Sequence, residues 1–243
     1  MMLTISGGVV ALGGDRVVGT ALVTRYGRAT AAINMVIVDT ATRGHGIGRR
    51  LMDFALQASE GRDCRLTATQ DGLPLYEKLG FRACGEILQH QGIAREAAIA
   101  RTGVDWATAD DIAAIAKLDQ AAFGADRGAL MALLCEQGRF AVLRQEGRPS
   151  GFAAIRSFGR GEVVGPVVAA TGNDARMLIS FLCAARPGAF LRVDTPRTSG
   201  LAAWLAEQGL AHVGSGIAMR RGAHASGQAA GVQTFALASQ ALG

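Results

Sequence analysis

Residues 33–52, with the sequence INMVIVDTATRGHGIGRRLM, contain the pattern that decides the fold. Apolar and β-branched residues dominate positions 33–38, which predicts a strand. From Leu51 onward apolar residues recur at helical spacing, which predicts a helix. The connecting loop RGHGIG, residues 43–48, has three glycines, so its backbone can turn sharply and a ligand can approach its N–H groups. A glycine loop that opens a helix predicts an anion site, because unpaired amides and the positive end of the helix dipole point the same way.

The glycine loop also fits a plain connection between a strand and a helix. Its spacing is too short for a Walker loop, and it differs from the dinucleotide-binding pattern Gly-x-Gly-x-x-Gly. On the loop alone, anion binding and plain connection both stay open.

A second motif, LYEKLGF at residues 75–81, lies about one strand and one helix beyond the loop, the distance that a parallel crossover requires. Arg43, Gly46 and Gly48 form R-x-x-G-x-G after an apolar strand and resemble the acyl-CoA pyrophosphate loop of the GNAT superfamily of N-acyltransferases. The second motif resembles the same superfamily's helix with an acid tyrosine and a Gly-Phe end. The two motifs in this order imply a mixed α/β (α+β) fold of the GNAT type.

The resemblance implies that acetyl-CoA binds in a gap between two splayed parallel strands. Its pyrophosphate is expected on the loop amides, and its pantetheine arm is expected to pair with the backbone of Val38 like an added strand. His45 is interpreted as a neutral loop residue rather than as a base. The residues expected to contact the cofactor are Val36, Val38, Arg43, Gly44, His45, Gly46, Ile47, Gly48 and Arg49.

Two residues are expected to act in catalysis. The resemblance places the backbone N–H of Val36 where it polarises the thioester carbonyl, an effect that is typically worth about 3–4 kcal/mol. Tyr76 is expected to act as the general acid that protonates the coenzyme A thiolate. The alternative for Tyr76 is a helix tyrosine that only packs on the core.

No general base stands out in the sequence. The strand before the loop offers only Asn34 and, just past its end, Asp39. A water chain or Asp194 also stays open as the base, although Asp194 equally fits a strand-end residue that caps the following turn.

The chain repeats one order of elements, which predicts two tandem GNAT-like domains at residues 1–95 and 104–243. The first domain is expected to lack the strand and helices that usually precede the GNAT meander. In the second domain, alignment places Leu205 where Tyr76 stands and TGNDA, residues 171–175, where the glycine loop stands. The second domain is therefore expected to keep the fold without the phosphate site or the acid.

Each domain is expected to end in its own closing strand, at residues 81–90 in the first and 212–220 in the second. An Ala- and Arg-rich stretch at residues 94–103 is interpreted as a linker, and residues 222–228 as a loose tail. Residues 232–242 are apolar enough to dock as a final strand.

The composition excludes several classes of function. Hydrophobic residues at 49% and charged residues at 19% are typical of a soluble globular protein. The net charge of +5 is thinly spread and aromatic residues are only 5%, so no nucleic-acid surface is expected. The four cysteines are isolated, so neither a metal site nor a disulfide framework is expected. No stretch approaches the roughly 18 apolar residues of a membrane helix, so a cytoplasmic protein without membrane association is expected.

The sequence predicts an N-acetyltransferase that transfers an acetyl group from acetyl-CoA to a primary amine of a small molecule or peptide. It does not identify the acceptor, and it leaves monomer and homodimer both open. One alternative is a non-catalytic acyl-CoA sensor, which the missing base and the missing helices favour. A second alternative is an interaction protein without a ligand, in which the loop glycines serve only as turns.

Overall fold

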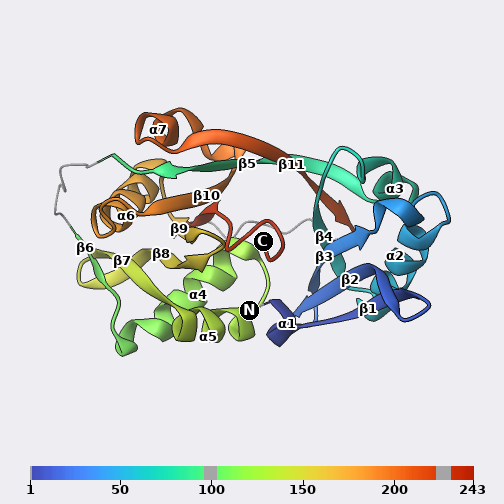
Figure 1. Ribbon diagram of the computed structural model, residues 1–243. Coiled ribbons are helices and arrows are strands. Elements are labelled where there is room, and N and C mark those ends of the chain that lie inside the picture. Colours follow the sequence, from blue (N-terminus) through green and yellow to red (C-terminus); the bar gives the residue numbers. More distant parts are fainter. Residues whose placement is uncertain (1, 96–102, 223–230) are drawn as a thin grey trace. The chain divides into compact units, whose positions relative to one another are not determined.

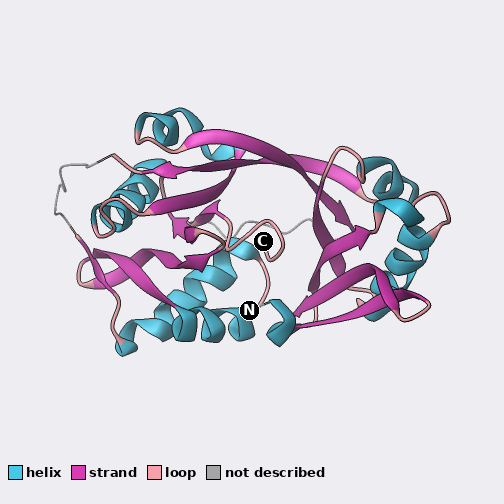
Figure 2. Cartoon of the chain, viewed as in Figure 1, coloured by secondary structure: helices cyan, strands magenta, loops and turns pink. Residues whose placement is uncertain are grey.

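The computed structural model describes residues 2–95, 103–222 and 231–243, and these form a mixed α/β structure (Figures 1 and 2). The chain divides into two compact units. Unit 1 contains Met1–Cys84, Gly216–Ala225 and Ala241–Gly243, and unit 2 contains Gly85–Ser215 and Ser226–Gln240. These units do not coincide with the sequence repeats. The predicted linker and loose tail fall mostly outside the described residues.

Unit 1 begins with a single helical turn and a meander of three antiparallel strands, followed by two helices that alternate with a strand. Its elements are α1 (Met2–Ile5), β1 (Ser6–Gly13), β2 (Arg16–Tyr26), β3 (Thr30–Val38), η1 (Thr40–Thr42), α2 (Ile47–Ala58), β4 (Asp63–Ala68) and α3 (Leu73–Lys78). Strands β3 and β4 are parallel neighbours, as the crossover helix between them requires.

The core of unit 1 lies between α2, α3 and one face of the sheet. Leu51, Met52 and Ala55 are buried on α2 because residues three and four apart lie on one side of a helix. They pack in one cluster with Ala21 of β2 and Ile33 of β3, among others. This packing holds the start of α2 next to the end of β3, where the predicted site lies.

Unit 2 repeats this order with one more strand and two more helices at its start. Its elements are β6 (Val104–Trp106), η2 (Ala109–Asp111), α4 (Ile112–Phe123), α5 (Gly128–Gln137), β7 (Gly138–Gln145), β8 (Arg148–Phe158), β9 (Gly161–Ala169), α6 (Gly172–Ala184), β10 (Phe190–Pro196), η3 (Arg197–Ser199), α7 (Ala202–Glu207) and β12 (Gln233–Ala236). The three-residue strand β6 was not predicted, because so short a segment shows no alternation.

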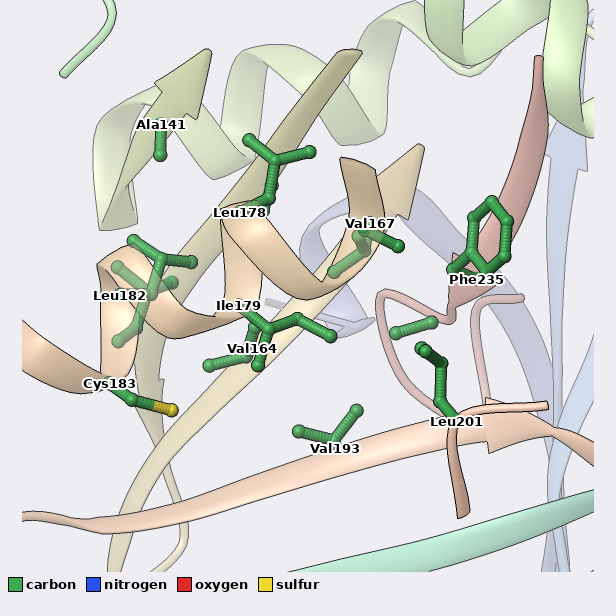
Figure 3. Close-up of a cluster of buried hydrophobic side chains, with 14 of the residues drawn as sticks. Ala141, Val164, Val167, Leu178, Ile179, Leu182, Cys183, Val193, Leu201 and Phe235 are labelled. Atoms are coloured by element: carbon green, nitrogen blue, oxygen red, sulfur yellow. The ribbon is translucent and has the colours of Figure 1, made fainter. Parts of the chain in front are cut away.

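The core of unit 2 lies between α6 and the sheet. Leu178, Ile179 and Leu182 of α6 are fully buried against strands β7 to β10 (Figure 3). Phe235 of β12 belongs to the same cluster, which confirms that part of the predicted final strand docks on the fold.

Each unit is closed by a strand from the other half of the sequence. In unit 1, β4 pairs with residues 217–221 of β11 (Ala211–Arg221). In unit 2, β10 pairs with residues 87–93 of β5 (Arg82–Ile93). The prediction that each domain keeps its own closing strand is therefore wrong, although both segments are strands. Residue alternation shows that a segment is a strand but not which of two similar sheet edges it joins.

Asp111 fixes the start of α4 in unit 2 and predicts a pH dependence of stability. Its carboxylate accepts two hydrogen bonds from the Arg144 guanidinium, at 2.9 and 2.8 Å, and closes a capping box with the Thr108 N–H. The Arg144 hydrogen bonds, followed by the Thr108 N–H, lower the pKa of Asp111 from 3.8 to about 2. Because the folded pKa is the lower one, this stabilisation is complete above about pH 4 and is lost as the pH falls through 2.

We therefore expect the free energy of unfolding of unit 2 to fall between pH 4 and pH 2 partly through Asp111. Denaturant titrations at several pH values in this range give the free energy of unfolding as a function of pH. The slope of this free energy against pH should be shallower for Asp111→Asn than for the wild type. The exposed carboxylate of Asp110, one position away, provides the control, and Asp110→Asn should keep the wild-type slope. Equal slopes for all three proteins would contradict the assignment.

Candidate active site

The loop between β3 and α2 presents an uncapped helix N-terminus. Gly46 is the N-cap of α2, and no side chain of the described residues caps the helix there. The first intrahelical bond runs from the Arg50 N–H to the Gly46 carbonyl at 3.1 Å. The N–H groups of Ile47, Gly48 and Arg49 therefore have no acceptor within the helix and are available to an anion.

The three loop glycines have different roles. Gly44 and Gly46 adopt left-handed φ values of +84° and +74°, and in the part of the chain that the structure describes, no atom beyond the adjacent residues lies within 4 Å of a Cβ built at either one. Both positions thus combine a turn that favours glycine with free space beside the backbone. Gly48 lies inside α2, where a Cβ would stand 3.4 Å from Leu75 and 3.6 Å from Val38, so it allows close packing instead.

Three side chains that the sequence singled out lie exposed on or beside the loop. His45 Nδ1 lies 3.0 Å from the Arg43 carbonyl, so its ring folds back on the loop. The Arg43 Nε donates to the Val38 carbonyl at 3.4 Å. Arg49 pairs with Asp53 one turn along the helix. Their positive charge lies near the helix N-terminus, and their contact with a cofactor stays a prediction.

Strand β3 has a bulge that includes Val36, for which the sequence predicted a catalytic role. Thr20 of β2 faces Ile37, and Leu22 faces Asn34, so Met35 and Val36 together oppose a single residue of β2. Met35 has a positive φ of +50°, and its carbonyl accepts a hydrogen bond from Thr20 Oγ1 at 2.7 Å. A bulge interrupts the ladder and re-aims the backbone next to it. No sequence pattern indicated this bulge, because Met35 is not a residue that favours positive φ.

Strands β3 and β4 separate just before this bulge. Their parallel ladder joins Thr30 to Asp63 and ends at Ala32 and Arg65. Val36 and Val38 lie beyond the last pair, at the end of β3 that leads into the glycine loop. The expected splay between two parallel strands is thus present, with the two predicted backbone contacts along it.

Tyr76 is held by the C-terminal cap of α3. The Phe81 N–H donates to the Tyr76 carbonyl at 3.0 Å, and the Gly80 N–H donates to the Glu77 carbonyl at 2.9 Å. With Gly80 at φ +83°, these bonds form a Schellman motif, and the rings of Tyr76 and Phe81 meet edge-on at 6.0 Å. Tyr76 is 8% exposed, and burial raises the pKa of its hydroxyl above 10.0. Within the described residues, no group hydrogen-bonds this hydroxyl.

The same motif in unit 2 confirms the alignment of the two repeats. The Leu210 N–H donates to the Leu205 carbonyl at 2.9 Å, and the Gly209 N–H to the Ala206 carbonyl at 3.0 Å. Leu205 therefore occupies the position of Tyr76 and supplies no acid. At the start of α6, the Thr171 hydroxyl accepts from the Asp174 N–H, and the Asp174 carboxylate accepts from the Thr171 N–H, so a capping box closes the end that is open in α2.

The side chains considered as general bases are engaged elsewhere. Asp39 caps η1 through the Ala41 N–H and pairs with Arg16. Asp194 is fully buried in unit 2 and pairs with Arg192, so it is a structural residue of the fold. Asn34 is buried in unit 1, where its Nδ2 donates to Thr24 Oγ1 at 3.3 Å.

Two family models with the description Acetyltransferase (GNAT) domain match the chain, one over residues 6–83 and the other over residues 115–232. The chain belongs to the GNAT family. It contains two GNAT domains in tandem, and GNAT acetyltransferases generally use acetyl-CoA.

The relatives of this GNAT chain include proteins named as acetyltransferases. The uncharacterized N-acetyltransferase YitH of Bacillus subtilis (strain 168) is 30% identical over 176 residues, which cover 70% of the chain and 62% of YitH. A glucosamine 6-phosphate N-acetyltransferase of Trypanosoma brucei brucei is 40% identical over 77 residues, which cover 28% of the chain and 52% of that protein. The chain thus spans less than two thirds of either relative. The crystal structure of a proposed acetyltransferase from Pyrococcus horikoshii shares the fold, with 21% identity, a TM-score of 0.80, and coverage of 98% of this chain and 80% of that one.

In residues 2–95, 103–222 and 231–243 of the GNAT chain, no three His, Cys, Asp or Glu side chains gather closely enough to hold a metal ion. No helix there is long and apolar enough to span a membrane.

Proposed function

We propose that unit 1 transfers the acetyl group of acetyl-CoA to a primary amine. The observation that supports this function best is the uncapped N-terminus of α2, which opens onto free space beside Gly44 and Gly46. An anion there lies at the end of the splay between β3 and β4, so one extended ligand fits both features. Acetyl-CoA supplies such a ligand, with a pyrophosphate at one end of its pantetheine arm and an activated acetyl group at the other.

In this proposal, the loop between β3 and α2 binds the cofactor, and β3 polarises its acetyl group. The amides of Ile47, Gly48 and Arg49 bind the pyrophosphate, and Arg43 adds positive charge. The N–H of Val36, next to the bulge in β3, donates to the carbonyl oxygen of the acetyl group, where negative charge develops during attack.

Tyr76 gives its proton to the departing sulfur. Because burial raises its pKa, the hydroxyl stays protonated at neutral pH.

The alternative of a non-catalytic acyl-CoA sensor rests on a separate observation. Asp39 and Asp194 are engaged in ion pairs, so neither is free to take the proton from an amine. A sensor would need the phosphate site and the splay but no base. Turnover separates the two functions, since both require acetyl-CoA binding.

The experiment is an assay of free coenzyme A released from acetyl-CoA in the presence of a panel of amines. The panel includes glucosamine 6-phosphate, because a relative that matches 28% of the chain is named for that substrate. Release that depends on one amine supports the transferase. Acetyl-CoA binding without release for any amine favours the sensor, and no binding at all contradicts both.

Replacement of Tyr76 tests the acid directly. Tyr76→Phe is expected to lower kcat about 100-fold, because general acid catalysis contributes at least this factor, while the Kd of acetyl-CoA stays unchanged. Tyr26→Phe is the matched control: Tyr26 is the other tyrosine, and its hydroxyl donates to the Leu242 carbonyl at 2.8 Å in unit 1. The control should keep kcat. Equal kcat for Tyr76→Phe and wild type across the pH range would remove the acid assignment without affecting the binding site.

A further inference from the structure

The gap between β9 and β10 of unit 2 contains a segment of the chain itself. These two parallel strands pair only at Leu191 with Glu162 and at Arg192 with Val163, and they then separate as β3 and β4 do in unit 1. Strand β12 pairs antiparallel with the open part of β9, from Gln233 opposite Ala169 to Ala236 opposite Val167. An added strand thus takes up the hydrogen-bonding edge that the splay exposes.

The same segment is also hydrogen-bonded to the other side of the gap. The Leu237 N–H donates to the Asp194 carbonyl of β10 at 2.8 Å. The Thr195 hydroxyl donates to the Phe235 carbonyl at 2.6 Å. The Gln240 amide donates to the Asp194 carboxylate at 3.1 Å. Residues 233–240 are therefore held by both strands that form the gap.

Side-chain packing fixes the segment in place. Phe235 is 2% exposed and lies in the core cluster of unit 2 with Leu201, Val193 and Val167 (Figure 3). A Cβ built at Gly165 of β9 would overlap the Leu237 carbonyl, so the backbone of the segment lies directly on this strand. The segment is thus an integral part of the core.

Unit 1 has the corresponding gap and an open helix end, whereas in unit 2 the gap is filled and the helix end is capped. The start of α6 is closed by the capping box of Thr171 and Asp174, whose carboxylate would repel a phosphate. Its splayed strands already bond to residues 233–240. The capped helix end and the filled gap leave unit 2 without a binding site for an anionic, extended ligand.

We propose that residues 233–240 are a permanent internal ligand of unit 2, and that acetyl-CoA consequently binds at unit 1 only, one molecule per chain. The internal ligand depends on the structure of unit 2 alone, whereas the single acetyl-CoA site rests on the function proposed for unit 1. Residues 233–240 thereby fill the gap between β9 and β10 and form part of the core of unit 2.

The first arm of the test measures hydrogen exchange on the full-length protein. Residues 233–236 and 167–169 should be protected to the same degree, because they share one ladder. Phe235→Ala should accelerate exchange in both segments while leaving β2 of unit 1 unchanged. If that variant unfolds, Thr195→Val removes one hydrogen bond to the segment and should produce the same local pattern. Complete exchange of residues 233–240 within seconds in the wild type would overturn the internal ligand.

The second arm is calorimetric titration of acetyl-CoA into the full-length chain. One site is expected, abolished by Gly46→Glu at the start of α2 and kept by Gly172→Glu at the start of α6. Two sites in the wild type, or one site abolished by Gly172→Glu, would overturn the assignment to unit 1. No binding by the wild type would overturn the function proposed for unit 1, while hydrogen exchange still decides the internal ligand.

Discussion

Gly46→Glu is expected to weaken acetyl-CoA binding about 1,000-fold, which amounts to its loss in a calorimetric titration. Gly46 has φ +74°, and a side chain there is strained by about 1–3 kcal/mol. The new carboxylate would also stand beside the amides of Ile47 and Gly48, and like charges placed together typically cost several kcal/mol. The strain is the same in the free and the bound protein, so it lowers stability and not affinity. The repulsion acts on binding alone, and at about 4 kcal/mol it corresponds to about 1,000-fold, because each 1.4 kcal/mol is tenfold in Kd.

Gly147→Glu is the matched control for this substitution. Gly147 lies in the turn between β7 and β8 with φ +77°, and no atom lies within 4 Å of a Cβ built there. Both variants thus introduce the same strain and the same charge, and both should lose a similar amount of stability. Only Gly46→Glu should lose binding. Unchanged affinity in Gly46→Glu would show that the loop is a plain connection.

The sequence predicts best those features whose backbone geometry requires one residue type. The turn of Gly44 and Gly46 and the Schellman motif that ends at Gly80 both need left-handed φ values, which favour glycine. The second Schellman glycine, Gly209, allowed Leu205 to be aligned correctly with Tyr76. The capping box of Thr108 and Asp111 likewise requires particular residue types, because its two side chains bond to the backbone at a fixed spacing.

The features that the sequence did not predict depend on partners distant in the chain. The exchange of β5 and β11 leaves each strand with the same alternating pattern whichever unit it joins. The bulge at Met35 arises from the register of β3 against β2. The position of Phe235 between two splayed strands likewise depends on a gap formed more than forty residues earlier in the chain. Local propensity contains none of this information, because tertiary contacts decide it.

Loss of the buried ion pair between Asp119 and Arg127 is expected to destabilise unit 2 by about 3–5 kcal/mol. The two side chains are 1% and 0% exposed, and they join α4 to the N-cap of α5 through two hydrogen bonds of 2.9 and 2.6 Å. The guanidinium also lies 4.0 Å from the centroid of the Phe123 ring. Asp119→Ala would leave the positive charge of Arg127 buried without its carboxylate, and this desolvation cost dominates the predicted effect.

Tryptophan fluorescence during urea unfolding measures this effect in unit 2 alone. Both tryptophans of the chain, Trp106 and Trp204, belong to that unit. The double variant Asp119→Leu with Arg127→Met is the control, since replacing both charges by apolar side chains of similar size is often neutral or stabilising. The double variant should therefore be more stable than Asp119→Ala, although it lacks the ion pair. If the free energy of unfolding of Asp119→Ala lies within about 1 kcal/mol of the wild-type value, the pair contributes no more than a surface ion pair. The junction of α4 and α5 then depends on apolar packing instead.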